Sequence, residues 1–410
     1  MQRRQFLYLS GLLAQRAHAW SSEGGQGIPS LNSEGKQGTS TSEDQPSGKE
    51  FLARLIPTRQ DVDDWLDGHK FPFSKYDSEL GYLHRDRRFK EGMDGTICTY
   101  TYDPSGARHT IMNADMDMVC RINTYGNSFT SCEQVSDGET WQEVLAAFLG
   151  EPIRNYGIGA YSVYQAYLRM KREESRNPAS YIILNIFGDD HFRNLLSYQA
   201  IGFGKIWQHF CPPLPHVVVN LATGQVVEIP NPCPTPESLY NLCDLDWVYK
   251  TFGNDFFLKR RLAREREKLP NAGGVTADPI LTQAALLAST YIVNRVEEFA
   301  AANNKKVLYV LSYDPFTVIK RLQGEKRFDQ TFVDFLEERK LPYVDLMEAH
   351  AADYAQFKSS AKDYVFRYYV GHYNPLGNLF CAFAMRNKLV SMLDPKPAPY
   401  SGPYQSATSS

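Results

Sequence analysis

The sequence predicts an α/β protein whose central parallel sheet is covered by helices on both faces. Strand-like and helical segments alternate from residue 118 to about residue 389, a pattern typical of parallel strands joined by crossover helices. Residues 181–187 form an almost continuous apolar run, as expected of a strand buried on both faces. Several predicted helices also start at a capping residue. We therefore expect a three-layer α/β/α sandwich.

The composition excludes several classes of protein. Of the 410 residues, 43% are hydrophobic and 22% are charged, so a disordered or collagen-like chain is ruled out. A net charge of −3 gives no basic field, and nucleic acid is therefore not an expected partner. No apolar run in the sequence is long enough for an ordinary membrane-spanning helix, so no stable membrane insertion is expected.

Residues 1–19 are expected to be an export signal. Arg3 and Arg4 precede a short apolar run, and Ala17 and Ala19 provide the small residues that a signal peptidase reads. The twin arginines resemble a Tat signal, so the expected partner is the Tat or Sec export machinery and the expected location is periplasmic or extracellular. A basic amphipathic first helix is the alternative interpretation.

Two terminal segments are expected to be flexible. Residues 20–50 are rich in Gly, Ser and Glu, with too few aliphatic side chains to offset the loss of chain entropy on folding, and residues 395–410 are expected to form a loose tail. The seven cysteines show no CxxC spacing, which argues against a zinc ribbon. If the chain is exported, Cys233 and Cys243 are the first pair to test for a disulfide.

Residues 51–115 are expected to form an N-terminal extension. A β-prone segment, 97–102, is followed by the turn Asp103-Pro104-Ser105-Gly106 and then by residues 108–112, which together predict a hairpin.

Residues 116–394 are expected to form the main domain, with a Pro-rich insertion, or cap, at 192–274. Within the insertion, Thr223-Gly224 separates two valine-rich segments and predicts a second hairpin. Strands of the main domain are predicted at 118–125, 153–156, 181–187, 307–311 and 342–346, and helices at 141–149, 161–176, 278–299, 329–339 and 374–389.

Four short segments carry residues suited to chemistry. In open parallel sheets, ligands bind outside the carboxyl ends of the strands. Three of these segments follow predicted strands there, and the fourth precedes the last helix. They are Gly126-Asn127-Ser128-Phe129-Thr130, Asn155-Tyr156-Gly157, Gly188-Asp189-Asp190-His191 and Gly371-His372-Tyr373-Asn374-Pro375.

The order and spacing of these segments resemble those of the SGNH/GDSL hydrolase family. The resemblance runs from residue 118 to about 389, apart from most of the insertion. It implies a flavodoxin-like fold and ester hydrolysis or acyl transfer. Separately, no cofactor is expected, and no metal is expected because consecutive residues in a turn, such as Asp189-Asp190-His191, seldom bind one ion together. The resemblance also implies that Ser128 is the nucleophile and His372 the catalytic histidine. Chemistry favours the same pair, because a serine hydroxyl needs a base, and imidazole titrates near neutrality.

The oxyanion of a tetrahedral intermediate needs hydrogen-bond donors. The candidate donors are the backbone N–H groups of Ser128 and Gly157. The family's oxyanion Asn corresponds to Asp190, whose carboxylate would repel the negative charge if ionised, so Asn194 is a possible substitute. Asn127 stands where the family has Asp.

The largest departure lies before the histidine. Tyr369 and Val370 occupy the positions where the family's orienting Asp is expected. A backbone carbonyl or a remote acid, with Asp189 or Asp190 as candidates, could orient His372 instead.

The leading hypothesis is an exported serine esterase acting on small-molecule or carbohydrate esters, including O-acyl groups. The alternatives are an acyltransferase that uses a glycan acceptor and a catalytically decayed glycan-binding protein. Each residue also has a purely structural interpretation: Ser128 as a helix cap, Gly157 as a turn glycine and His372 as a hydrogen-bonded histidine at a helix start.

Overall fold

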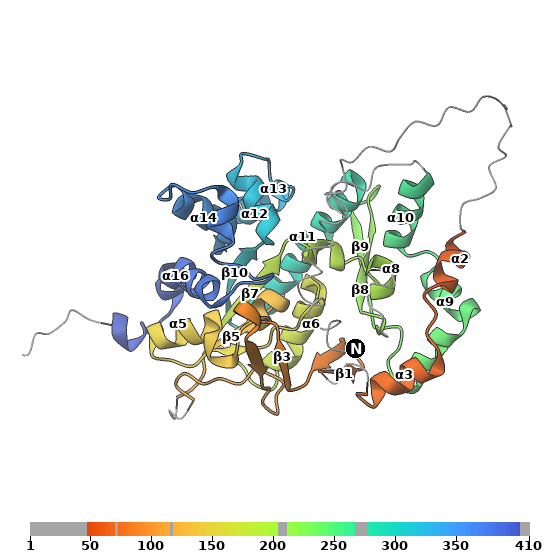
Figure 1. Ribbon diagram of the computed structural model, residues 1–410, viewed down its shortest axis with the longest axis horizontal. Helices are drawn as coiled ribbons and strands as arrows, with labels where there is room; N and C mark the ends of the chain where they lie inside the picture. Colours follow the sequence, from red (N-terminus) through yellow and green to blue (C-terminus); the bar gives the residue numbers. More distant parts are fainter. Residues whose placement is uncertain (1–46, 70–72, 115–117, 204–210, 267–277, 402–410) are drawn as a thin grey trace, which may run out of the picture.

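The computed structural model describes residues 47–69, 73–114, 118–203, 211–266 and 278–401 (Figure 1). Its centre is a five-stranded sheet in the order β11-β10-β7-β5-β6, and every neighbouring pair is parallel. Counted along the chain within this sheet, the order is 2-1-3-4-5, the flavodoxin-like arrangement. The predicted α/β class is therefore confirmed. The strands are β5 (Ile122–Tyr125), β6 (Arg154–Asn155), β7 (Tyr181–Phe187), β10 (Lys306–Ser312) and β11 (Tyr343–Asp345).

Two pairs of helices form the outer layers. Helices α5 (Trp141–Leu149) and α16 (Pro375–Met392) pack against each other on one side of the sheet, and α6 (Val163–Glu174) and α11 (Pro279–Ala302) do so on the other (Figure 1). The caps of the helices predicted at 278–299 and 374–389 are as expected, because Asp278 caps α11 and Asn374 caps α16. The three-layer sandwich follows from this arrangement.

Further helices complete the C-terminal half of the molecule beside β10 and β11 (Figure 1). Of these, the helix predicted at 329–339 is α13, and the other three were not predicted individually. They are α12 (Pro315–Leu322), α13 (Gln330–Glu338), α14 (Leu346–Tyr354) and α15 (Ala361–Val365).

In the N-terminal extension, the predicted pairing of residues 97–102 with residues 108–112 is wrong. Strand β4 (Ile97–Tyr100) is present, but its antiparallel partner is β3 (Arg87–Lys90), which precedes it in the chain. The predicted turn does reverse the chain, yet it leaves only an isolated bridge between Tyr102 and Arg108. The extension also contains α2 (Gly48–Ala53), α3 (Arg59–Leu66), η2 (Met93–Gly95) and a second antiparallel pair, β1 (Ser74–Asp77) and β2 (Gly81–His84).

Most of the insertion packs beside the sheet domain. The predicted hairpin is confirmed as β8 (His216–Asn220) and β9 (Gln225–Ile229). The hairpin lies against α6 and α11, while the helices that follow it contact α2 and α3 of the extension. The insertion's helices are α7 (Asp190–Arg193), α8 (Gln199–Phe203), η5 (Glu237–Cys243), α9 (Leu245–Phe252) and α10 (Phe256–Arg266).

The predictions of flexible segments at 20–50 and 395–410 are wrong for the parts of them that the structure describes. The leader does not extend to residue 50, because Ser47 caps α2 through a reciprocal bond with Glu50. The start of the tail is held as well, since η7 (Ala398–Tyr400) packs on α5 and Arg121 donates to the Pro395 carbonyl at 2.8 Å. The expected export signal, 1–19, lies outside the described residues and stays a prediction.

Two further features concern the described residues as a set. All seven cysteines are among them and carry free thiols, so the suggested disulfide between Cys233 and Cys243 is not formed. None of the described helices combines the length and the apolar character needed to cross a lipid bilayer.

Candidate active site

A tight turn presents Ser128 at the carboxyl end of β5. Gly126 has φ +148°, and a Cβ there would lie 2.2 Å from Thr130 Oγ1, so only glycine fits this turn. Asn127 then caps the short helix α4 (Ser128–Ser131), because its side chain accepts the Phe129 N–H at 2.8 Å. Since β5 neighbours both β6 and β7, Ser128 lies at the point where the strand order reverses, which is where ligands bind in such sheets.

His372 reaches Ser128 from the other end of the chain. Its Nε2 lies 2.8 Å from Ser128 Oγ, within hydrogen-bond distance. The histidine comes two residues before Asn374, whose side chain accepts the Gly377 N–H and starts α16. The Phe129 ring lies 4.9 Å from the imidazole, centroid to centroid. The structure thus brings together the two side chains that the sequence predicted as a reacting pair.

Gln134 fixes the orientation of the imidazole. Its Oε1 accepts the backbone N–H of His372 at 2.6 Å and lies 3.1 Å from Nδ1. Because a carbonyl oxygen can only accept, Nδ1 carries the proton, and Nε2 is left free to accept from the Ser128 hydroxyl. Gln134 Nε2 donates to the Glu91 carbonyl at 3.3 Å, which agrees with this assignment of the amide. The sequence interpretation missed Gln134 and expected a backbone carbonyl or a remote acid, Asp189 or Asp190, in its place.

The N-terminal extension holds the loop that carries Gln134. The buried Arg108 guanidinium donates to the Cys132 carbonyl at 2.8 Å and to the Val135 carbonyl at 2.6 Å, and it pairs with Asp137 at 2.7 Å. The Tyr100 hydroxyl accepts the Gln134 N–H at 2.6 Å. The N-terminal extension therefore helps to position Gln134, and through it His372.

Charged side chains surround the imidazole. Glu133 Oε2 lies 3.9 Å from His372 Nε2, and Glu133 Oε1 pairs with Arg87 at 3.1 Å. Burial lowers the pKa of His372, Glu133 opposes this, and Arg193 and Arg87 lower that pKa further. His372 is consequently neutral near neutral pH, as a general base must be.

Asn127 and Asp190, two of the residues that depart from the expected pattern, bind each other. Asn127 Nδ2 donates to Asp190 Oδ1 at 2.7 Å, and Arg193 donates to the same oxygen at 2.8 Å. The Phe187 N–H donates to Asp190 Oδ2 at 3.0 Å. Burial raises the pKa of Asp190 to about 7, although Arg193 and the two neutral donors work against this. The resemblance predicts Asp at position 127 and Asn at position 190, whereas this chain has Asn127 and Asp190. The site therefore still contains one amide and one carboxyl group, with their positions exchanged.

Three predicted site residues have other partners. The Asn194 amide donates to Ser289 Oγ at 2.9 Å, and its carbonyl oxygen accepts the Tyr164 N–H, so it links α11 and α6 instead of facing an oxyanion. The Asp189 side chain is 54% exposed and lies 3.8 Å from Arg193. Asp190 is fully engaged as described above. Neither aspartate orients His372, since Gln134 occupies its Nδ1.

Gly157 packs directly on α4. A Cβ at this position would lie 2.2 Å from the Ser131 backbone nitrogen, so the glycine allows the two backbones to touch. Its N–H donates to Asn155 Oδ1 at 2.9 Å. The predicted oxyanion donor is therefore already hydrogen-bonded within the protein.

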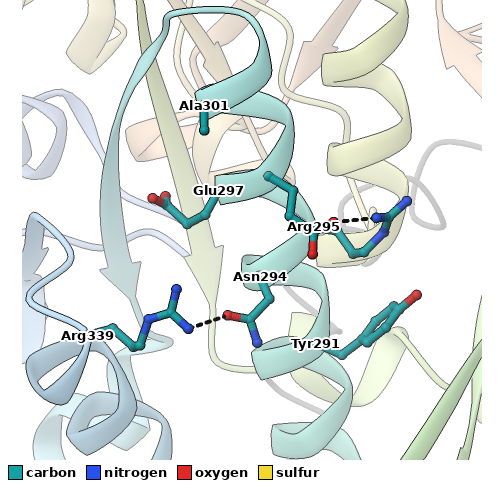
Figure 2. Close-up of a pocket in the computed structure, with 7 residues that line it drawn as sticks. Tyr291, Asn294, Arg295, Glu297, Ala301 and Arg339 are labelled. Carbon is teal, nitrogen blue, oxygen red and sulfur yellow. Dashed lines mark hydrogen bonds and ion pairs between the residues drawn. The ribbon is translucent and has the colours of Figure 1, made fainter.

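A separate hollow of about 640 Å³ lies beside α11 (Figure 2). Two pairs of its polar side chains bind each other, since Arg339 donates to Asn294 at 3.2 Å and Arg295 pairs with Glu298 (Figure 2). Glu297 is held from outside the hollow, where it accepts from the Tyr309 hydroxyl of β10. The hollow contains neither Ser128 nor His372, and its internal pairing indicates a structural network. Its lining residues are Tyr291, Asn294, Arg295, Glu297, Glu298, Ala301 and Arg339.

Comparison with known proteins finds distant structural similarity only. No family model and no curated protein matches the chain. Among solved structures, an acetyl xylan esterase has 12% identity and a TM-score of 0.36, and the match covers 66% of this chain and 99% of the esterase. A protein of Desulfitobacterium hafniense assigned to the G-D-S-L lipolytic family has 10% identity, a TM-score of 0.28 and coverage of 64% and 98%. An α/β hydrolase from the Lake Arreo metagenome has 12% identity, a TM-score of 0.33 and coverage of 65% and 93%. Similarity at this level does not transfer an activity, so function must be inferred from the residues of this chain.

Proposed function

We propose that this chain is a serine hydrolase that cleaves carboxylic esters. The observation that carries the proposal is the hydrogen bond of 2.8 Å between Ser128 Oγ and His372 Nε2. The tautomer fixed by Gln134 leaves Nε2 unprotonated, and the lowered pKa of His372 keeps the ring neutral. A nucleophile next to an oriented neutral base is the arrangement that serine catalysis requires.

In the first half-reaction, Ser128 Oγ attacks the ester carbonyl carbon while His372 Nε2 takes the hydroxyl proton. The tetrahedral intermediate collapses when the bond to the alcohol oxygen breaks, and His372 returns the proton to that oxygen. In the second half-reaction, His372 takes a proton from water, and the resulting hydroxide attacks the acyl-enzyme. Collapse of this second intermediate releases the carboxylic acid and returns the proton to Ser128 Oγ.

The negative oxygen of each intermediate needs donors. The Ser128 N–H is the best candidate, because the first amides of a helix have no intrahelical acceptor. Arg193 adds positive potential, since its charge also lowers the pKa of the nearby His372. Gly157 would contribute only if Asn155 released its N–H.

The test compares Ser128→Ala with Ser131→Ala, a second buried serine on the same short helix. Purified variants are treated with a fluorophosphonate probe and assayed with p-nitrophenyl acetate. We expect Ser128→Ala to lose labelling and about 10³-fold or more of the rate, and Ser131→Ala to retain both. Equal labelling of Ser128→Ala and the parent would overturn the nucleophile assignment. A folded parent that is never labelled would favour the glycan-binding alternative.

We also infer that the chain is exported. The inference rests on the twin arginines and the small residues at 17 and 19. Fractionation of cells that express the full chain tests it, with Arg3→Lys and Arg4→Lys together as the variant that should retain the protein inside.

A further inference from the structure

Glu133 places a carboxylate oxygen next to the reacting pair. Its Oε2 lies 3.9 Å from His372 Nε2, the same nitrogen that lies 2.8 Å from Ser128 Oγ. The Glu133 side chain is 17% exposed, so it is mostly buried but remains accessible. Ester hydrolysis as proposed above assigns no role to this group.

The carboxylate is held in place from two sides. Arg87, on β3 of the N-terminal extension, donates to Oε1 at 3.1 Å, and its guanidinium lies over the Tyr100 ring at 4.2 Å. On the other side, a Cβ at Gly159 would lie 2.2 Å from Oε1, so only glycine leaves room for the carboxylate there. The position of Glu133 therefore depends on both the extension and the main domain.

Glu133 is ionised, and its Oε2 is not used by a hydrogen bond within the protein. Burial alone would raise the pKa of Glu133, but Arg87 and His372 outweigh it and lower that pKa. Oε1 is used by Arg87, whereas no donor among the described residues lies within hydrogen-bond distance of Oε2. An ionised carboxylate only accepts hydrogen bonds, and Oε2, which solvent reaches, is free to accept one from a bound molecule. A donor from the substrate would satisfy it.

The geometry identifies the part of the substrate that could supply this donor. His372 Nε2 must return a proton to the alcohol oxygen of the ester, so that oxygen comes within about 3 Å of Nε2. Oε2 lies 3.9 Å from the same nitrogen. A hydroxyl on the carbon next to the esterified one is therefore placed to donate to Oε2. An anionic group at that position would be repelled by the carboxylate.

We propose, on the basis of the ester hydrolysis inferred above, that Glu133 binds a free hydroxyl adjacent to the ester oxygen. The substrate class is then the acyl esters of neutral polyols, including sugars, in which an unmodified hydroxyl neighbours the acylated one. Arg87 and Gly159 position the carboxylate, and Glu133 itself contacts the substrate.

The test uses two acetates of similar size. In 2-hydroxyethyl acetate, a hydroxyl replaces the terminal methyl group of propyl acetate, so the two differ mainly in the proposed donor. The parent should hydrolyse the hydroxylated ester with the higher kcat/KM. Glu133→Gln should reduce that preference about 10-fold when both rates are measured on the pH plateau, because the charge-assisted hydrogen bond is lost. Glu133→Asp, which keeps the charge but draws the carboxylate back, should also lose preference. Glu338→Gln, on the exposed face of α13, is the matched control.

Fluorophosphonate labelling of Ser128 in each variant shows that the site is folded. A parent without preference, or an unchanged preference in a labelled Glu133→Gln, would overturn the proposal. So would an equal loss on both esters on the pH plateau, because Glu133 would then act on the reaction without binding the neighbouring hydroxyl. Absence of both labelling and hydrolysis in the parent would instead refute the serine hydrolase function itself, and this inference with it.

Discussion

Gln134 Oε1 accepts the backbone N–H of His372 at 2.6 Å and lies 3.1 Å from Nδ1 of the same residue. One neutral amide thus fixes both the position and the tautomer of the imidazole. A carboxylate at this place would also stabilise the positive charge that forms on the ring during the reaction, which an amide does less effectively. The site has an orienting group, but the only carboxylate described near the imidazole, Glu133, faces Nε2.

Replacing Gln134 with methionine removes the acceptor while keeping a side chain of similar length. Nδ1 is then free to lose its proton, and the population with the wrong tautomer grows. We expect the rate on p-nitrophenyl acetate to fall about 10²-fold or more, since loss of an orienting partner is costly in serine catalysis. Steady-state kinetics should show the loss in kcat. Gln323→Met, at the exposed end of α12, is the control, and a Gln134→Met variant as fast as that control would show that the amide has no positioning role.

The pH dependence of the rate follows from the lowered pKa of His372. Only the neutral ring can take the proton of Ser128, so activity is present above that pKa and is lost as the pH falls through it. We expect the acid limb of kcat/KM to have its midpoint below 6.5, the ordinary value for histidine. Gln134→Glu brings a negative charge to Nδ1 and should move the midpoint to higher pH. A shift in the opposite direction would contradict this electrostatic account.

Much of the fold could be predicted because its signals are local. The apolar run at 181–187 coincides with β7, and the capping residues Asp278 and Asn374 begin α11 and α16 as expected. The partner of β4 could not be predicted in the same way. Its four residues pair with β3 instead of with the segment after the turn, and the loop at 131–137, anchored by Arg108, lies against that segment. The strand that pairs with β4 is decided by long-range packing, and the sequence of a short strand does not predict its partner.

The proximity of Ser128 and His372 could be predicted from the sequence, whereas the residues around them could not. Ser128 and His372 each occur in a short motif beside a predicted strand or helix. Glu133 and Gln134 lie in an irregular loop, and Gln134 adopts a left-handed conformation with φ +71°. No periodicity marks such positions. The one available signal was that Glu133 and Gln134, whose side chains can bind an imidazole or a hydroxyl, follow Ser128 within six residues.

Arg108 should contribute strongly to stability. Its guanidinium is buried, donates to several backbone carbonyls and pairs with the Asp137 carboxylate at 2.7 Å. Arg108→Met leaves those carbonyls and that carboxylate without their donor, and we expect the free energy of unfolding to fall by about 3–5 kcal/mol. Denaturant unfolding measures this, with Arg88→Met, an exposed arginine on β3, as the control. Equal midpoints for the two variants would contradict the anchoring role.

The Asn127–Asp190 pair predicts a double-mutant cycle. Asn127→Asp alone places a second carboxylate against Asp190, at the position where Nδ2 now donates at 2.7 Å, and should lower the free energy of unfolding. Asp190→Asn alone removes the buried carboxyl group that accepts from Arg193 at 2.8 Å and should also destabilise the fold. The double variant again contains one amide and one carboxylate, so its loss should be smaller than the sum of the single losses, by roughly 1–3 kcal/mol. Denaturant unfolding of all four proteins gives the coupling directly. Additive losses would mean that the two residues do not act as a pair, and the reversed order would then have no structural explanation.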